Sequence, residues 1–246
     1  MSGDERPSRA ARVIPTALAQ GEIEILGLMP DSSNDTLLAR CRTADQECFA
    51  IYKPARGEAP LWDFPEGTLH RREVAAFVVA DALGWPNVPP TALREGPMGP
   101  GSLQLFVRFD AAQHYFTLAE EREDDFRKVA LFDLVVNNAD RKSGHCLLAE
   151  DATIWVIDHG VCFSDEPKLR TVIWDFVDEP IPEDLRNDLL GLRERLATPG
   201  ELRSALEELL SPVEVESTAD RLERLVAAGR FPAPEPGVRP IPWPPI

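Results

Sequence analysis

Two short polar motifs, each placed at the end of an apolar segment, constrain the fold of this chain more than any other feature. The first is Asn138-Ala139-Asp140-Arg141, which follows an amphipathic segment, and the second is Ile157-Asp158-His159-Gly160. Between them, apolar stretches at 146–148 and 154–157 predict a β-hairpin. A hairpin of this kind brings Asp140 and Asp158 to one site, where two carboxylates can hold a metal ion beside phosphate groups.

The remaining periodic segments predict an α+β fold with two lobes. The chain has 246 residues, of which 43% are hydrophobic, and this is enough for one large domain or for two lobes around a cleft. A small antiparallel sheet with one helix is predicted first, with strands at 22–29, 36–42, 47–53, 91–94 and 102–109 and a helix at 69–83 that begins after Thr68.

The second half of the chain is predicted to be mainly helical. Helices are expected at 123–137 and 183–196, and two further helix starts are indicated by Thr198-Pro199-Gly200-Glu201 and Ser211-Pro212-Val213-Glu214, which match a cap, a first-turn proline and a capping-box glutamate. The end of the chain is proline-rich and is interpreted as an extended tail that wraps the body or binds a partner. The predicted units are an N-terminal arm (1–19), an N-lobe (20–109), a C-lobe (110–229) and the tail (230–246).

Composition limits the partners of the chain. Lys and Arg total 26 against 42 Asp and Glu, and the resulting net charge of −16 opposes binding to nucleic-acid backbones and to anionic membranes. No apolar run approaches the roughly 20 residues that span a bilayer, and the N-terminus lacks the apolar core of a signal peptide. We therefore expect a cytoplasmic protein with no nucleic-acid partner and no membrane insertion. The four cysteines show no CxxC spacing and are interpreted as buried thiols.

Phosphoryl transfer requires a held triphosphate, a metal ion that neutralises its charge and an acceptor placed in line. Lys53, at the end of a predicted strand, could reach the phosphates, and Glu73, early on the next helix, could pair with it. Taken alone, each residue also has an ordinary interpretation, because lysines at strand ends are usually solvated and glutamates are favoured near helix N-termini. The downstream motifs favour the pairing.

The two aspartates have different predicted roles. Asp140, beside Arg141, is the candidate that orients or deprotonates the acceptor, and Asp158 is the candidate Mg²⁺ ligand, with Gly160 allowing a sharp turn after it. The alternatives are an Asx turn with a local Asp-Arg pair at the first motif and a simple strand-end turn at the second.

These motifs resemble the phosphatidylinositol 3- and 4-kinase-like superfamily and, more narrowly, its small actinobacterial members. The resemblance covers roughly residues 20–175 and rests on Tyr52-Lys53-Pro54, Arg72-Glu73-Val74-Ala75 and the two aspartate motifs. It implies a two-lobed protein-kinase-like fold that uses ATP and Mg²⁺ or Mn²⁺. It also implies that Asp140 is the catalytic aspartate, that Asp158 binds metal and that Lys53 binds nucleotide phosphate.

The chain departs from the superfamily pattern at two places. His145 stands five residues after Asp140, where these kinases usually have an Asn as second metal ligand, and imidazole suits Mn²⁺ better than Mg²⁺. The nucleotide loop lacks a glycine-rich run, so Ser32 and Ser33 are the predicted phosphate donors there. Adenine is expected against the last strand of the sheet, near Gln104, Phe106 and Val107.

The segment after Gly160 bears on the acceptor. It contains only Lys168 and Arg170 as basic residues before the next helix, and this argues against an anionic lipid headgroup. We therefore expect a kinase-like phosphotransferase that acts on a protein or a small-molecule acceptor. Two alternatives remain open: a noncatalytic, pseudokinase-like nucleotide-binding regulator, and an enzyme that transfers AMP on the same fold.

Overall fold

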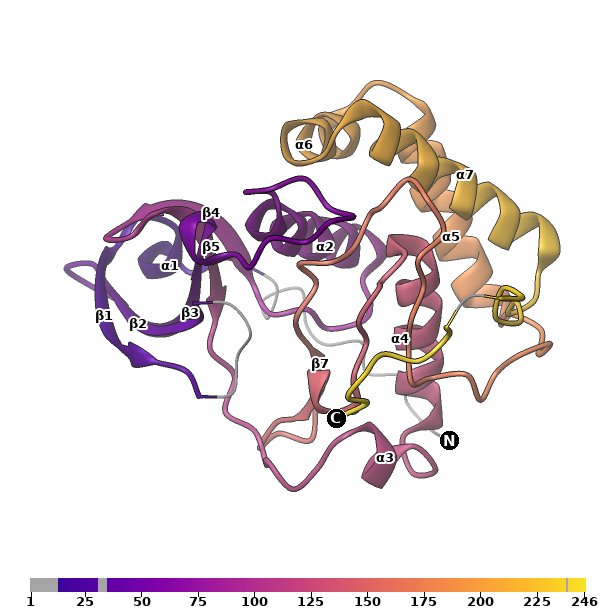
Figure 1. The fold of residues 1–246 in the computed structure, drawn as a ribbon, viewed down its shortest axis with the longest axis horizontal. Coiled ribbons are helices and arrows are strands. Elements are labelled where there is room, and N and C mark those ends of the chain that lie inside the picture. The colour runs from indigo at the N-terminus through magenta and orange to yellow at the C-terminus, as the bar shows by residue number, and fades with distance from the viewer. Residues whose placement is uncertain (1–12, 31–34, 238) are drawn as a thin grey trace.

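The computed structural model describes residues 13–30, 35–237 and 239–246, and it confirms the α+β, two-lobed architecture (Figure 1). The N-lobe is a five-stranded antiparallel sheet in the order β1-β2-β3-β5-β4. Its strands are β1 (Glu22–Leu28), β2 (Leu37–Arg42), β3 (Glu47–Pro54), β4 (Thr91–Gly96) and β5 (Gly99–Leu105). The short 3₁₀ turn η2 (Ala55–Gly57) follows β3.

The fifth strand differs from its predicted bounds of 102–109. It begins at Gly99, because Gly96 and Gly99 pair across a tight turn, and it ends at Leu105, where the chain leaves the sheet toward the C-lobe. The glycines of this segment suggest a loop in the sequence, but in the structure they allow β5 to pack closely against β3. A Cβ at Gly101 would lie 2.5 Å from the Lys53 carbonyl oxygen, so only glycine fits beside this part of β3.

The predicted N-terminal arm ends in a packed helix. Helix α1 (Thr16–Gln20) buries Ala17 and Leu18 completely against one face of the sheet, in a cluster with residues such as Tyr52 and Leu103. The apolar side chains therefore join residues 16–20 to the N-lobe core. The predicted boundary between residues 19 and 20 falls inside this packed region.

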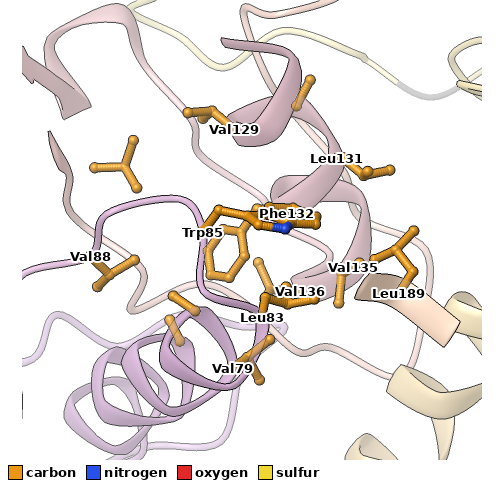
Figure 2. Packing of buried hydrophobic residues seen from close by; sticks show 14 of the residues in the cluster. Val79, Leu83, Trp85, Val88, Val129, Leu131, Phe132, Val135, Val136 and Leu189 are labelled. Atoms are coloured by element: carbon orange, nitrogen blue, oxygen red, sulfur yellow. The ribbon is translucent and has the colours of Figure 1, made fainter. Parts of the chain in front are cut away.

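Helix α2 (Leu69–Leu83) lies between the two lobes. It ends at Gly84, whose φ of 83° allows the left-handed cap. Its apolar residues pack into the core of the C-lobe, and Figure 2 shows Val79 and Leu83 beside Phe132 and Val136. Thr68 stands at the N-cap position, but its hydroxyl donates to the Pro65 carbonyl (2.7 Å) instead of capping the helix, so that part of the prediction is wrong.

The remaining elements form the C-lobe (Figure 1). They are α3 (Tyr115–Leu118), α4 (Glu123–Val136), the 3₁₀ turn η3 (Ser143–His145), the hairpin of β6 (Cys146–Leu148) and β7 (Ile154–Val156), α5 (Glu183–Ala197), α6 (Glu201–Leu209) and α7 (Pro212–Ala228).

The two predicted helix starts have different outcomes. The capping box at Ser211 and Glu214 is confirmed, because the Ser211 amide donates to the Glu214 carboxylate (2.8 Å) and the Ser211 hydroxyl accepts from the Glu214 amide. The predicted box at Thr198 is wrong. The Thr198 hydroxyl instead donates to the Glu194 carbonyl (3.1 Å) at the C-terminal end of α5, and α6 begins only at Glu201, with Gly200 at its N-cap position.

The proline-rich tail lies along the body of the protein. Its backbone carbonyls at Pro240 and Pro245 accept hydrogen bonds from the C-lobe, and Pro242 is buried. Of the two interpretations, the structure therefore favours a tail that wraps the body. In the described part of the chain, no helix has the length and apolar character needed to cross a membrane, and all four cysteines are free thiols.

Candidate active site

The centre of the candidate site is the ammonium group of Lys53. It reaches from β3 to two carboxylates, pairing with Glu73 on α2 and with Asp158 after β7, where the Nζ–Oδ1 distance is 3.0 Å. The second oxygen of Glu73 accepts from the His159 backbone amide (3.0 Å). Burial opposes the charge on Lys53, but Asp158 and Glu73 together raise its pKa above the usual value. Three distant segments therefore meet at one cation.

Asp158 is held as an ionised carboxylate in an unusual backbone conformation. Its φ of 63° lies in the left-handed region, which non-glycine residues rarely adopt and which often marks a functional site. The positive charge of Lys53 holds the pKa of Asp158 well below its usual range. The side chain is 47% exposed, so this carboxylate faces the cleft and can accept a ligand.

Asp140 lies in the loop after α4 and is also accessible. Its amide donates to the Asn138 side chain (3.0 Å), and its carboxylate lies 3.5 Å from the Lys142 ammonium group. Burial, assisted by the negative charge of Asp158, raises the pKa of Asp140, which suits a group that takes up a proton. The nearby cation is thus Lys142 rather than Arg141.

Arg141 lies beneath the loop, where its side chain is fully buried. Its guanidinium pairs with the buried carboxylate of Asp133 (3.0 Å), and it also donates to the Ile157 carbonyl (2.8 Å) and contacts the His159 ring (2.7 Å). In this position Arg141 fixes the Asp140 loop against the Asp158 turn. The geometry is that of a positioning residue.

Two residues of this network were missed by sequence reasoning. Asp133 interrupts the apolar run of α4 in Leu131-Phe132-Asp133-Leu134, and a lone acid in such a run is a signal of a buried partner. Asn137 ends α4 with a φ of 52°, and its side chain donates to the carbonyls of Ser164 (3.0 Å) and Glu166 (2.7 Å). It thereby holds the segment that follows the Asp158 motif.

His145 lies beside Asp158, the predicted metal ligand, with its ring nitrogen near the carboxylate. Its Nδ1 accepts from the Lys142 backbone amide (3.3 Å), so the proton of the neutral ring lies on Nε2, which faces Asp158 Oδ2 at 3.3 Å. Burial lowers the pKa of His145 to about 4, which keeps the ring neutral at pH 7. With the proton on Nε2, the ring orients Asp158. Metal binding by His145 stays a prediction.

The donor set nevertheless fits a hard divalent cation. Asp140 and Asp158 present accessible carboxylates. Burial first, and then the like charge of Asp158, raise the pKa of Asp140, and a cation between the two carboxylates would relieve their repulsion. Among the described residues, no group of three or more His, Cys, Asp or Glu side chains could by itself hold a metal ion. Water or a bound ligand would have to complete the coordination of such a cation.

The residues predicted to contact the nucleotide differ in how available they are for binding. Gln104 lies within β5, and its side chain donates to Thr91 (3.0 Å), while the Phe106 amide is bonded to the Phe49 carbonyl (2.9 Å). Val107 lies just beyond the end of β5, and its contact with adenine stays a prediction. Ser32 and Ser33 lie outside the described residues.

Comparison with known proteins places the chain in a family. The protein Rv2133c of Mycobacterium tuberculosis is 35% identical, over 92% of this chain and 93% of that protein. This chain belongs to the Rv2133c family. No protein-family model matches it.

More distant relatives of the Rv2133c-family chain are plant kinases. Phosphatidylinositol 4-kinase gamma 4 of rice is 31% identical over 59% of this chain and 30% of the plant protein. Phosphatidylinositol 4-kinase gamma 2 of Arabidopsis thaliana is 25% identical over 60% of this chain and 34% of that protein. The chain thus spans about a third of these plant proteins.

A solved structure supports the fold. The crystal structure of the Helicobacter pylori proinflammatory kinase CtkA matches with a TM-score of 0.54 over 87% of this chain and 94% of that one, at 13% sequence identity. The Rv2133c-family chain therefore has a kinase-like fold.

Proposed function

We propose that this chain is an ATP- and divalent-metal-dependent phosphotransferase of the phosphatidylinositol 3- and 4-kinase-like class. The observation that carries the proposal is the bridge from Lys53 to Glu73 and Asp158. In protein kinases, a strand lysine paired with a glutamate of the following helix is part of the catalytically competent arrangement, together with a metal-binding aspartate. Here all three groups are already in contact, with Nζ 3.0 Å from Asp158.

The residues have separate roles in the proposed reaction. Lys53 binds nucleotide phosphate, and Asp158 with Asp140 presents carboxylate oxygens to Mg²⁺ or Mn²⁺, which when bound neutralises charge on the phosphates. Asp140 orients the acceptor hydroxyl and takes up its proton, a role that its raised pKa favours. Arg141 holds the Asp140 loop in register with the Asp158 turn.

The proposed acceptor is a protein or a small molecule rather than an anionic lipid. The plant relatives are named as phosphatidylinositol kinases, but the basic groups suited to such a headgroup are scarce here. Of the two basic residues after Gly160, Lys168 is already paired with Asp63 (3.4 Å) and Glu166 (3.3 Å). Only Arg170 remains, beside several acidic side chains.

The proposal is tested by metal-dependent ATP turnover in the presence of protein acceptors, small hydroxyl compounds and phosphatidylinositol vesicles. We expect Asp140→Asn to reduce turnover by about 100-fold or more while nucleotide binding is retained. In Asp158→Asn, addition of Mg²⁺ or Mn²⁺ should no longer stimulate ATP turnover. Asp81→Asn, an exposed aspartate on α2, is the matched control and should behave as wild type.

Labelling the α- or the γ-phosphate of ATP separates AMP transfer from phosphoryl transfer in the same assay. Turnover that is insensitive to Asp140→Asn would contradict the proposed mechanism. Efficient labelling of phosphatidylinositol, with no other acceptor labelled, would contradict the proposed acceptor class.

A second candidate, a noncatalytic nucleotide-binding regulator, is favoured by His145. Because its protonated Nε2 faces Asp158, the position that usually supplies a second oxygen ligand supplies a hydrogen-bond donor. Binding of ATP without turnover in the wild type, combined with turnover gained in His145→Asn, would favour this candidate over the enzyme.

A further inference from the structure

A cavity lies on the C-lobe, and of the residues described for the candidate active site only Asn137, at the end of α4, lines it. It measures about 310 Å³ and is enclosed by α7, the C-terminal end of α4, the segment after the Asp158 motif and the proline-rich tail. This volume is at the lower end of the range of small-molecule sites. None of Lys53, Glu73, Asp140, His145 and Asp158 lines it.

Three arginines line this cavity, Arg221, Arg224 and Arg230. Arg221 donates to the Val135 carbonyl (2.9 Å), the Ser164 carbonyl (3.1 Å) and the Thr218 hydroxyl (2.7 Å), which are all neutral acceptors.

Arg224 and Arg230 likewise form no ion pair with a carboxylate of the described residues. Arg230 donates to the Asp178 backbone carbonyl (2.6 Å), and Arg224 is exposed. Within the described part of the chain, none of the three arginines forms an ion pair with a carboxylate.

The absence of such pairs is informative because acids are abundant. The chain has 42 acidic residues against 26 basic ones, so a cluster of arginines would be expected to find carboxylates. Two exposed acids, Asp165 and Glu235, line the same cavity but pair with none of these arginines. Burial, followed by the like charge of Arg224, lowers the pKa of Arg221 to about 10, and a bound anion would offset both effects.

Much of the remaining cavity wall is apolar. The indole of Trp174 forms part of it and is held in place by a hydrogen bond to the Pro240 carbonyl (3.1 Å), and Leu134 and Leu225 contribute aliphatic surface. An occupant that fits therefore needs an anionic group for the arginines and an apolar body for the indole and the leucines.

We propose that this cavity binds a small organic anion, whose phosphate or carboxylate is held by Arg221 and Arg224 and whose apolar ring packs on Trp174. Guanidinium groups bind phosphate and carboxylate oxygens with the same bidentate geometry, so both anions share the recognising chemistry. The site is separate from the proposed nucleotide site, and the inference does not depend on the proposed function.

Isothermal titration of the full chain with four probes tests this site. The probes are naphthyl phosphate, naphthoate, inorganic phosphate and naphthol. We expect at least one naphthyl anion to bind saturably and the ring-free phosphate and the uncharged naphthol to bind at least about tenfold more weakly. Binding of only one of the two naphthyl anions supports the site and identifies its anion.

Two variants assign the binding to this cavity. Arg224→Gln removes an exposed charge and should weaken binding by about tenfold or more, and Ala228→Phe fills the cavity without a charge change and should abolish binding. Arg203→Gln on α6 is the control for charge, and Lys53→Met excludes the nucleotide site; both should bind as wild type. Absence of saturable binding, or wild-type affinity in both cavity variants, would overturn the proposal.

Discussion

His145 links the catalytic loop to Asp158 through both nitrogens of its ring. One nitrogen accepts from the Lys142 amide and the other faces the Asp158 carboxylate, so the ring has to stay neutral to keep both contacts. The physical consequence is a site whose geometry depends on the protonation state of one side chain. This dependence can be measured through stability.

We expect His145 to make the folded state sensitive to mild acid. The pKa of His145 is about 4 in the folded state against 6.5 ordinarily, so between these values the unfolded chain takes up a proton that the folded chain does not. Stability from this residue is complete above pH 6.5 and falls as the pH drops toward 4, by about 3 kcal/mol at most.

Urea unfolding of wild type and His145→Asn over this pH range measures the effect. The variant should lose less stability on acidification than the wild type. An identical pH dependence of the free energy of unfolding in the two proteins would contradict the assigned role.

At the scale of elements, a buried ion pair fixes α2 to α7. Arg72, 1% exposed, pairs with Glu214 and donates to the Cys162 carbonyl (2.7 Å), and its guanidinium lies 5.0 Å from the centre of the Phe64 ring. Arg72 directly precedes Glu73, so this pair also sets the position of the residue that holds Lys53. The C-terminal helices therefore contribute to the geometry of the cleft.

Glu214→Gln tests this contact. The change leaves the Arg72 charge buried without a carboxylate, and we expect a loss of roughly 3 kcal/mol in the free energy of unfolding. Glu216→Gln, on the same helix, removes a carboxylate that is 63% exposed and should change stability by no more than about 0.5 kcal/mol. Equal effects of the two substitutions in denaturant unfolding would show that the buried pair does not stabilise the lobe arrangement.

At the scale of the whole molecule, the tail connects distant parts of the C-lobe. The Pro240 carbonyl accepts from the Thr171 amide (2.9 Å), and the Pro245 carbonyl accepts from the Ser143 amide (2.9 Å), in the loop between Asp140 and His145. Figure 1 shows the last residues of the chain ending near β7. The tail thus lies along the C-lobe beside the loop between Asp140 and His145.

Removal of residues 239–246 should release these two contacts without unfolding the protein. We expect the amides of Ser143 and Thr171 to lose protection in hydrogen exchange by about tenfold or more, because each loses its only described acceptor. Ile246→Ala, which keeps both carbonyls, is the control. Unchanged protection at both amides after truncation would show that the tail does not hold the loop.

The sequence by itself determined the five strands of the N-lobe, the longer helices, the two aspartate motifs and the kinase-like division into lobes, but not the short helices α1 and α3. These features rest on local physics: apolar periodicity for α2 and α4, and turn residues for the antiparallel strands. The same local rules failed where a contact with another residue or strand set the local conformation. Thr68 has a cap sequence, yet its hydroxyl bonds to the Pro65 carbonyl, and β5 needs a glycine at Gly101 to pack closely against β3.

Only the tertiary structure decided how the site is assembled. Lys53 and Asp158 are 105 residues apart. The lone acid Asp133 in the apolar run of α4 signals a buried partner without identifying Arg141, and the proton position of His145 has no local sequence signature. The three arginines of the C-lobe cavity likewise become a cluster only when α7 and the tail pack together. Local propensities fix where elements begin and end. Long-range burial and charge pairing fix which side chains meet, and the proposed chemistry depends on these long-range contacts.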